Sequence, residues 1–540
     1  MGGSLPTPRP QQEAPLPASV RALTRRRGPL ALSVVLATLA MYLTLPQAGA
    51  QTAATAVVEP ATPDLIASAV DRSEITEAQG ALFLSYAFTA PDQVPEAYRS
   101  STPWSGTLPL LELKRTLKRL GAVPAAAEAR SVLRATSFDC SNFRASKPNT
   151  KSTAHFYLQY KNSSLQGLTA NQYGSALETT WSTEISGFGW ARPPKDPVSN
   201  PPGGRYPVRI ESLGVGLYGF VTGTHYAAHK NNPATPWNDR DAIASCMVLN
   251  QNFGPFPGTP TDAMRATVAH EFNHSIQFGY GALGGFGSVD SVFVEGGATW
   301  MEDEVFDTSN DNYNYLWPSF TTPMGKYAKS PYPYWIVFRA MTEPFGTGNA
   351  NGGEKIFQTF WEQLSKGDST NLQAMNKGFE AKGSSLAEAY HNASIALRFL
   401  RNCSSTAEPY CLEEGPAYAA TFAGPNDDLF NLGASDSATG RQIANDFALN
   451  WVGLPTVSGL DLAVTHQGGT GILEVSIACR TGNAVTVTHV GTATPAHPNL
   501  TEAAYDGSGC DEASAVISNV KMTSASPSSV TKTTYDIETS

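Results

Sequence analysis

The stretch 266-ATVAHEFNHSIQFGYG-281 contains two histidines and an acid whose types and spacing could support metal chemistry. His270 and His274 are four residues apart, so on a helix both project from one face, one turn from each other. That spacing lets two imidazoles meet one zinc ion at about 2.0–2.1 Å each. Glu271 stands beside His270, where it can reach a water on the metal without being a ligand. The stretch therefore predicts a metal site with a carboxylate beside its open position.

The residues around this stretch carry helix start and stop signals. Thr259 can cap a helix and Pro260 suits its first turn. Gly279 and Gly281 are typical of a helix end. The sequence thus predicts one helix from 260 to 279.

A third protein ligand is needed, and its position separates the classes of zinc site. The H-E-x-x-H pattern is typical of zinc peptidases, and one large group extends it to H-E-x-x-H-x-x-G-x-x-H. Gln277 and Tyr280 occupy the extension positions here, which excludes that group. The alternative ligand is a glutamate on a second helix. Glu295, 21 positions after His274, lies in 291-SVFVEGGATWMEDEVF-306 and is the candidate.

Two further features of this second helix bear on the site. Gly296 and Gly297 have low helix propensity, and close approach of two helices around an ion would explain them. Glu302 lies seven residues after Glu295 on the same helix face. We expect Glu302 to orient a ligand or anchor the helix pair, as carboxylates behind metal ligands do.

Other polar groups receive a weaker interpretation. His225 and His229 share the four-residue spacing but lack an intervening acid, so solvated histidines are favoured over a second metal site. The stretch 307-DTSNDNYN-314 could hold Ca²⁺, but it lacks the EF-hand glycine, so an ordinary polar loop is favoured. Asp303 and Glu304 are interpreted as a solvated charged face.

Length and charge limit the class of protein. The chain has 540 residues, more than one hydrophobic core usually serves, so two or three domains are expected. Acidic residues outnumber basic ones, 47 to 37, for a formal net charge of -10. A nucleic-acid partner, which would need a basic stripe, is not expected.

The first 50 residues resemble an export signal. Positive charge at 24-TRRRGPL-30 precedes an apolar run, 30-LALSVVLATLAMYLTL-45, and then the small residues of 48-AGA-50. The apolar run is shorter than the ~20 residues that a spanning helix needs. We therefore predict a cleaved signal peptide, a secreted or periplasmic product, and no stable membrane anchor after cleavage.

All six cysteines follow that cleavage site, and an even number in an exported chain suggests disulfides. The sequence alone leaves their connectivity open. Proximity along the chain favours two pairs and elimination gives the third: Cys403 with Cys411, Cys479 with Cys510, and Cys140 with Cys246.

The hydrophobic patterns and composition along the chain predict an α+β fold in three parts after the signal peptide. They are a helical region or propeptide at 51–135, a metal-binding domain at 136–435, and a C-terminal antiparallel β-sandwich at 436–540. The clearest N-terminal helix covers 110–123 and another covers 166–186. Strands are predicted at 154–160, 207–213, 242–249, 460–466, 471–480 and 484–490.

The two motifs together resemble the gluzincin metallopeptidases, whose third zinc ligand is a glutamate. The stretch 295-EGGATWME-302 is similar to the N-E-G-F-A-x-x-x-E pattern of the aminopeptidase branch, with Val294 in place of Asn. The layout is closer to a group of secreted bacterial metalloproteases with A-H-E-x-x-H-x-x-Q-x-G-Y and then E-x-x-A-T-W-M-E-D. Ala269–Tyr280 and Glu295–Asp303 have that form, and the resemblance covers about 150–345.

This resemblance implies a zinc peptidase with a thermolysin-like sheet and active-site helix pair, acting on proteins or peptides with one Zn²⁺. Glu271 would be the general base and His270, His274 and Glu295 the ligands. A downstream tyrosine would stabilise the oxyanion, which points to Tyr332. Tyr334 is the second choice, and a plain aromatic pocket wall is the alternative for both. The chain lacks the G-x-M-E-N signature of aminopeptidases, which favours an endopeptidase.

Two other functions stay open. An exported binding or adhesion protein could carry a structural or vestigial zinc site, and the C-terminal β-domain suits that idea. A structural site, however, has no need of Glu271. A different zinc hydrolase could also use the same scaffold, because a fold does not dictate a substrate.

Overall fold

The N-terminal helices begin the part of the chain that the computed structural model describes. The described residues are 60–135, 140, 147–161, 165–197, 201–281, 289–316, 323–324, 331–367, 369–403, 410–421, 429–523 and 531–540. The predicted signal peptide at 1–50 lies outside them. Residues Thr55–Ser540 belong to one compact unit. Within the described residues, no helix combines the length and the apolar character that crossing a membrane requires.

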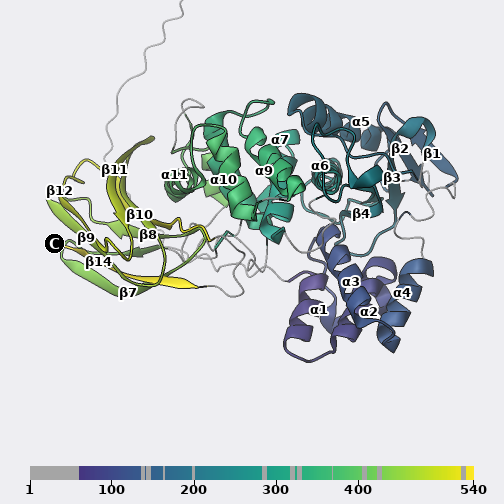
Figure 1. Ribbon diagram of the computed structural model, residues 1–540, viewed down its shortest axis with the longest axis horizontal. Coiled ribbons are helices and arrows are strands. Elements are labelled where there is room, and N and C mark those ends of the chain that lie inside the picture. The colour runs from purple at the N-terminus through teal and green to yellow at the C-terminus, as the bar shows by residue number, and fades with distance from the viewer. Residues whose placement is uncertain are drawn as a thin grey trace, which may run out of the picture. The chain divides into compact units, whose positions relative to one another are not determined.

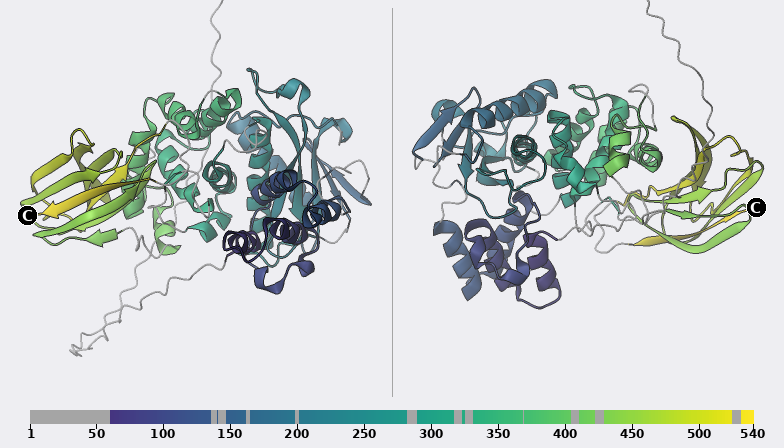
Figure 2. Two further views of the ribbon diagram at one scale, coloured as in Figure 1. Left: turned by 60° about the horizontal axis from the view of Figure 1, so that its bottom comes forward. Right: turned by 180° about the vertical axis from the view of Figure 1, so that it is seen from behind.

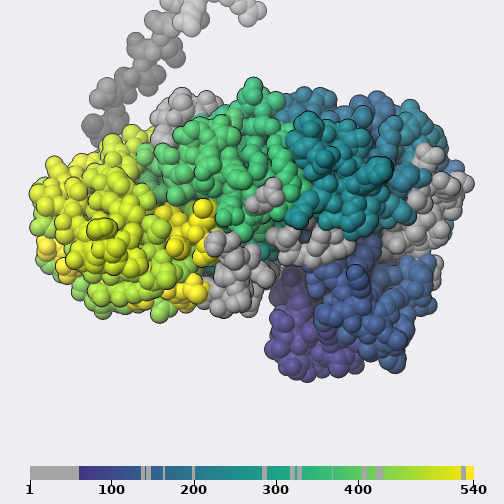
Figure 3. Space-filling model, in the orientation of Figure 1, coloured from purple at the N-terminus to yellow at the C-terminus, as the bar shows by residue number. Residues whose placement is uncertain are grey.

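Four helices form the N-terminal helical region, residues 60–135, and appear as the purple-to-blue surface in Figure 3. The helix predicted at 110–123 is confirmed as α3. Its apolar residues Leu110, Leu113 and Leu117 share one hydrophobic cluster with Leu217 and Phe220. The region therefore packs directly on the domain that follows. The helices are α1 Thr62–Asp71, α2 Glu77–Thr89, α3 Thr107–Leu120 and α4 Pro124–Ala135.

A mixed five-stranded sheet follows, in the order β1-β2-β3-β5-β4. β2, β3 and β5 are parallel, and β1 and β4 pair antiparallel at the two edges. The three central strands match predicted ones, whereas β1 and β4 were not predicted. The strands are β1 Asn149–Ser152, β2 Phe156–Tyr160, β3 Tyr206–Glu211, β4 Gly219–Tyr226 and β5 Ile243–Asn250.

Glycines in β4 obscure it in the sequence, because glycine weakens a strand. Gly219 is needed for space: a Cβ there would lie 2.8 Å from the Val248 carbonyl oxygen and 3.4 Å from Cγ of Glu271. β4 therefore passes close beside the predicted metal-binding helix.

Helices cover the sheet and extend beyond it, as Figure 1 shows. The helix expected at 260–279 is confirmed as α6, which packs against β5, β4 and α5. The helix expected at 166–186 is α5 followed by a π-helical turn. The elements are α5 Ala170–Trp181, the turn Ser182–Gly187, α6 Pro260–Gly279, the π-helical turn Val292–Gly296, α7 Gly297–Val305, α8 Trp335–Thr342, α9 Glu354–Lys366, α10 Asn371–Glu380, α11 Leu386–Phe399 and α12 Gly415–Thr421.

The C-terminal part consists of two β-sheets, which agrees with the α+β prediction. Their orders are β11-β10-β13-β8-β6 and β12-β9-β14-β7. Side chains of both sheets, such as Val464 from β9 and Val475 from β10, share one hydrophobic cluster, so the sheets face each other (Figure 2). The strands are β6 Leu429–Asn431, β7 Asp436–Ala444, β8 Ala448–Leu454, β9 Leu460–Gly468, β10 Leu473–Thr481, β11 Ala484–Ala493, β12 Asn499–Tyr505, β13 Glu512–Asn519 and β14 Lys532–Thr539.

Three disulfides join the cysteines in the predicted pairs: Cys140–Cys246, Cys403–Cys411 and Cys479–Cys510. The first ties the residue just beyond the N-terminal helical region to β5. The third links β10 to the start of β13. Disulfides of this kind are typical of proteins from oxidising compartments.

A buried histidine connects α11 to the first C-terminal sheet. His391 lies 3.0 Å from the Ser518 hydroxyl through Nδ1 and 2.8 Å from the Ser476 hydroxyl through Nε2. Burial, with repulsion from His489, lowers the pKa of His391 to about 3. The folded state therefore holds this imidazole neutral, whereas the unfolded chain protonates it below its ordinary pKa of 6.5.

His391 should make the protein sensitive to acid. Above the unfolded-state pKa of this histidine, its imidazole is neutral in both states and the protein keeps its full stability. As the pH falls below that value toward the folded-state pKa, only the unfolded chain binds the proton, so stability is lost. Between about pH 7 and about pH 4.5 the loss should be about 2–3 kcal/mol. In urea unfolding at the two pH values, the variant His391→Gln should show a smaller loss than the wild type by about that amount. The exposed control His497→Gln should behave as the wild type does, and an unchanged pH dependence in His391→Gln would refute the assignment.

Candidate metal centre

Helix α6 presents both histidines because its local sequence fixes where it begins and how it is buried. The Thr259 side chain accepts a hydrogen bond from the Asp262 backbone N–H, and Pro260 occupies the first turn. From Ala263 onward almost every residue is buried, including His270 and His274. A polar helix face buried in this way needs partners for its side chains, because desolvated polar groups without them are costly.

The turn before α7 brings a third group to the same point. Glu295 lies in the π-helical turn, and α7 packs against α6. Gly296 allows close approach, as expected, but to a different element: a Cβ there would lie 3.1 Å from the Phe338 ring and 3.1 Å from the Pro331 carbonyl oxygen. The expectation that this glycine serves the approach of the two site helices is therefore wrong, because its crowded side faces α8 and the residues before it.

The three predicted ligands lie together and form a group that could hold one metal ion. The Nε2 atoms of His270 and His274 are 3.1 Å apart. The Oε2 atom of Glu295 is 3.0 Å from Nε2 of His270 and 3.4 Å from Nε2 of His274. All three side chains are buried. This is an H-E-x-x-H…E arrangement of one helix plus a later glutamate.

The protonation of the two imidazoles supports a cation at this point. Nδ1 of His270 lies 2.7 Å from Oε1 of Glu302, and Nδ1 of His274 lies 2.9 Å from Oε1 of Gln277. A carboxylate and an amide oxygen both accept, so each Nδ1 carries the hydrogen in the neutral ring. When both rings are neutral, each Nε2 presents a lone pair to the point that the two rings share, where a metal cation could accept both. The donor set therefore fits a metal ion.

A chain of hydrogen bonds behind His274 fixes the orientation of the Gln277 amide. Its nitrogen donates to Oδ1 of Asn273 at 2.8 Å and to the Val294 carbonyl oxygen at 3.1 Å, which leaves its oxygen facing His274. Asn273 in turn donates to Glu184 at 3.1 Å. The sequence analysis missed this chain, although Asn273 and Gln277 lie within the motif itself.

Several buried carboxyl groups lie close together at the site. Burial alone would raise the pKa of Glu295, but attraction by His274 and the close approach of both imidazoles outweigh burial and lower it to about 2. Burial raises the pKa values of Glu271, Glu302 and Asp311. One oxygen of Glu295 and one of Glu302 have no hydrogen-bond partner within the described part of the chain. A divalent cation would offset this excess of acid.

Both oxygens of Glu271 accept hydrogen bonds from donors that were not predicted from the sequence. Ser105 Oγ donates to Oε1 at 2.9 Å, and Thr107 Oγ1 donates to Oε2 at 2.8 Å. Both donors come from the start of α3, more than 160 residues earlier in the chain. No short-range pattern could have indicated them.

Of the two candidate tyrosines, Tyr332 lies at the site. Its ring centroid is 6.2 Å from that of His270, and it stacks on Tyr315 at 5.0 Å. Tyr334 instead packs in the hydrophobic core near Phe338. Tyr332 also lines a cavity of about 10 Å³ beside His270, together with Ser105, Tyr218, Thr267, Glu271, Glu302, Asp311 and Tyr315.

The interpretation of Asp303 and Glu304 as a solvated charged face is wrong. Asp303 is buried and forms an ion pair with Arg339, and Glu304 accepts a hydrogen bond from the Trp300 indole, so neither belongs to a freely solvated face. The polar stretch 307–314 contributes one residue to the surroundings of the site. Its residue Asp311 is buried and accepts a hydrogen bond from the Tyr218 hydroxyl at 3.1 Å. Within the described residues, the group of three His, Cys, Asp or Glu side chains that could share an ion lies at α6 and includes no residue of 307–314.

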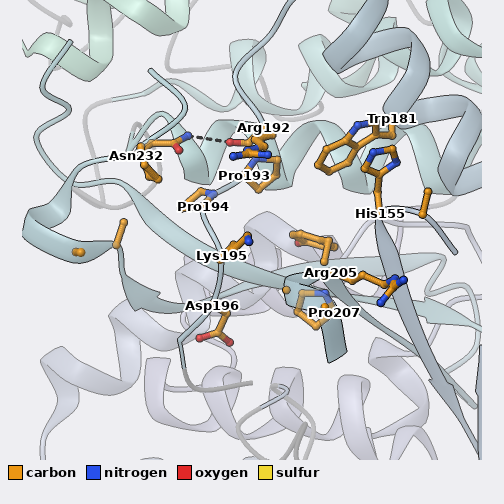
Figure 4. A pocket seen from close by; sticks show the side chains of 17 residues that line it. His155, Trp181, Arg192, Pro193, Pro194, Lys195, Asp196, Arg205, Pro207 and Asn232 are labelled. Atoms are coloured by element: carbon orange, nitrogen blue, oxygen red, sulfur yellow. Dashed lines mark hydrogen bonds between the residues drawn. The ribbon is translucent and has the colours of Figure 1, made fainter. Parts of the chain in front are cut away.

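His225 and His229 are exposed, as expected of solvated histidines. His225 lies 3.6 Å from Asp196. Asp196 lines a larger cavity, about 340 Å³, with His155 and Trp181 on one wall (Figure 4). None of the three predicted ligands lines this cavity, so it is separate from the metal centre.

Comparisons with known proteins add little. No protein-family model matches the sequence. No curated protein matches it either. Among solved structures, the periplasmic inhibitor of g-type lysozyme from Aeromonas hydrophila, PliG, is 10% identical, with a TM-score of 0.15, over 21% of this chain and 96% of that chain. The pre-peptidase C-terminal domain of collagenase from Bacillus anthracis is 9% identical, with a TM-score of 0.14, over 21% of this chain and 94% of that chain. Neither likeness is close enough to support a conclusion. The His270, His274 and Glu295 group is thus identified by its geometry.

Glu302 should control metal affinity through His270. The variant Glu302→Gln keeps an acceptor but removes the charge that strengthens the imidazole as a ligand, so zinc affinity should fall about tenfold or more. Competition with a chromophoric chelator measures this. The control Glu304→Gln, on the same helix but bonded to Trp300, should bind zinc as the wild type does. Equal affinity in Glu302→Gln and the wild type would show that Glu302 plays no part in metal binding.

Proposed function

We propose that this protein is a secreted zinc metallopeptidase, most simply an endopeptidase. The observation that carries the proposal is the convergence of His270, His274 and Glu295, with Glu271 next to the first of them on the same helix. Three protein ligands with one open position are typical of catalytic zinc sites. A purely structural zinc site usually has four protein ligands.

In this proposal, His270 and His274 hold the ion through Nε2 and Glu295 holds it through a carboxylate oxygen. Glu302 and Gln277 keep both rings in the tautomer that exposes Nε2. When bound, zinc lowers the pKa of water and polarises a carbonyl group. The described α+β sheet and helix pair are compatible with a thermolysin-like zincin domain, which we include in the proposal.

Glu271 is the proposed general base. A carboxylate oxygen of Glu271 takes the proton from the attacking water and passes it to the leaving amine nitrogen. Burial raises the pKa of Glu271, which makes it a better proton acceptor than an exposed carboxylate. Gly219 gives this side chain room beside β4.

Tyr332 is the proposed oxyanion donor. Burial raises the pKa of Tyr332 well above its ordinary value, so the phenol keeps its proton at any working pH. A neutral phenol near the metal ligands can donate a hydrogen bond to the negative oxygen that develops on the substrate.

The remaining features fit an exported hydrolase. Three disulfides suit an oxidising compartment. The partners we infer are protein or peptide substrates, and the missing exopeptidase signature favours cleavage within the substrate chain. Neither a nucleic-acid partner nor a membrane anchor after signal removal belongs to the proposal.

One observation favours the non-enzymatic alternative, a binding protein with a structural metal. Both oxygens of Glu271 accept hydrogen bonds from protein hydroxyls, as they would in a site without catalytic function. The two functions differ in whether Glu271 is needed for hydrolysis.

Replacement of Glu271 should separate metal binding from hydrolysis. The variant Glu271→Gln should keep one zinc per chain, since Glu271 is not a ligand, but its hydrolysis of casein should fall about a hundredfold or more. Metal analysis and a chelator-sensitive protease assay on protein without residues 1–50 test this. The surface control Glu380→Gln should retain wild-type activity, and full activity in Glu271→Gln would exclude the general-base role. If the wild type itself hydrolyses nothing in any state, the non-enzymatic alternative holds.

A further inference from the structure

The residues that lead into α3 lie along the outer edge of β4 and of the turn before it. The Trp104 backbone N–H donates to the Gly216 carbonyl at 2.8 Å, and the Tyr218 N–H donates to the Trp104 carbonyl at 3.1 Å. Two residues on, the Gly106 N–H donates to the Gly219 carbonyl at 2.8 Å. Trp104 and its partners form a parallel β-bridge. The N-terminal helical region thus adds a short extended segment to the sheet edge beside the metal centre.

The same segment holds Glu271. Ser105 and Thr107 donate to its two oxygens, and Thr107 Oγ1 also accepts from the Val221 N–H of β4 at 2.8 Å. The hydroxyls of Ser105 and Thr107 and the carboxylate of Glu271 are all buried. The proposed base is therefore bound on both oxygens by a part of the chain that lies outside the metal-binding domain.

Among the described residues, the space beside Glu271 is small. The cavity between Ser105, Glu271, His270 and Tyr332 measures about 10 Å³. That is space for about one water molecule. A peptide carbonyl group would not fit into this cavity unless its lining, which includes Ser105, moved.

Further contacts hold the N-terminal helical region against β4. Trp104 is 3% exposed and its ring packs edge-on against Phe88 of α2 at 5.1 Å. Farther along α3, Lys114 Nζ donates to the Thr222 hydroxyl of β4 at 2.6 Å. The N-terminal helical region thus contacts the sheet edge through a well-packed interface rather than through a single contact.

We propose that the N-terminal helical region is an intramolecular inhibitor, which closes the site by seating Trp104–Thr107 on the β4 edge and binding Glu271 through Ser105 and Thr107. This inference rests on the proposed function, since inhibition presupposes a hydrolase. It adds that residues 60–135 lower the activity of the intact chain and that their displacement opens the site. The competing explanation is that the two hydroxyls position Glu271 for catalysis. The two explanations predict activity changes of opposite sign.

The test compares two double variants of the chain without residues 1–50, each loaded with zinc. Ser105→Ala with Thr107→Val removes both donors to Glu271. The control, Ser85→Ala with Thr116→Val, makes the same changes at buried positions of the same region that do not touch the site. Measurements are zinc content, the rate at which a chelator extracts the zinc, and hydrolysis of casein.

We expect the site variant to retain zinc. It should release the zinc to the chelator at least about fivefold faster than the wild type and hydrolyse casein at least about threefold faster. The reason is that more weakly held residues 104–107 admit both chelator and substrate. The control should match the wild type. Slower hydrolysis at unchanged zinc content would overturn the inference and identify Ser105 and Thr107 as positioning residues.

A second measurement covers the case in which the site variant does not fold. A recognition sequence for a site-specific protease is inserted between Ala135 and Cys140, the chain is cut, and the N-terminal fragment is removed in dilute urea. The Cys140–Cys246 disulfide stays with the rest of the chain. Faster zinc extraction with hydrolysis supports the inference. Faster extraction without hydrolysis supports the cover but refutes the peptidase. Unchanged extraction and hydrolysis, compared with the uncut chain in the same urea, refute the inhibitor alone.

Discussion

The convergence of two imidazole nitrogens on one point is the constraint on which the rest of the site depends. Each ring is held by an acceptor at Nδ1, Glu302 for His270 and Gln277 for His274, so both Nε2 lone pairs face the same small volume. With Glu295 beside them, these groups could hold one metal ion. The burial of α6, the π-helical turn that carries Glu295, and the hydrogen-bond chain behind Gln277 all serve to keep that geometry in a water-poor interior.

The elements that the sequence predicts well are those with local signals. Thr259 and Pro260 mark the start of α6, and the four-residue spacing places His270 and His274 on one face whatever surrounds the helix. Glu295 was found because a third ligand is a chemical requirement of such a pair. The disulfide pairs followed from proximity and elimination. In each of these cases the prediction needed only the residues of one helix or the number and spacing of one residue type.

The features that the sequence did not predict depend on contacts between distant segments. Ser105 and Thr107 look like ordinary helix-start residues, and only the folded chain places them on Glu271. Asp303 is part of an acidic run that resembles a solvated face, yet its partner Arg339 lies 36 residues later. β4 was missed because its glycines weaken a strand signal, and at least one of them exists to make room for α6. None of these contacts leaves a local pattern, so the surroundings of Glu271 and Asp303 could be described only from the structure.

Anomalous diffraction at the zinc absorption edge, from crystals of the zinc-loaded protein without residues 1–50, tests the metal centre most directly. We expect one strong peak within about 2.0–2.2 Å of Nε2 of His270, Nε2 of His274 and a carboxylate oxygen of Glu295. A zinc-loaded crystal with no peak there, or with the Glu295 side chain turned away from a peak bound elsewhere, would contradict the assignment of these three residues as ligands.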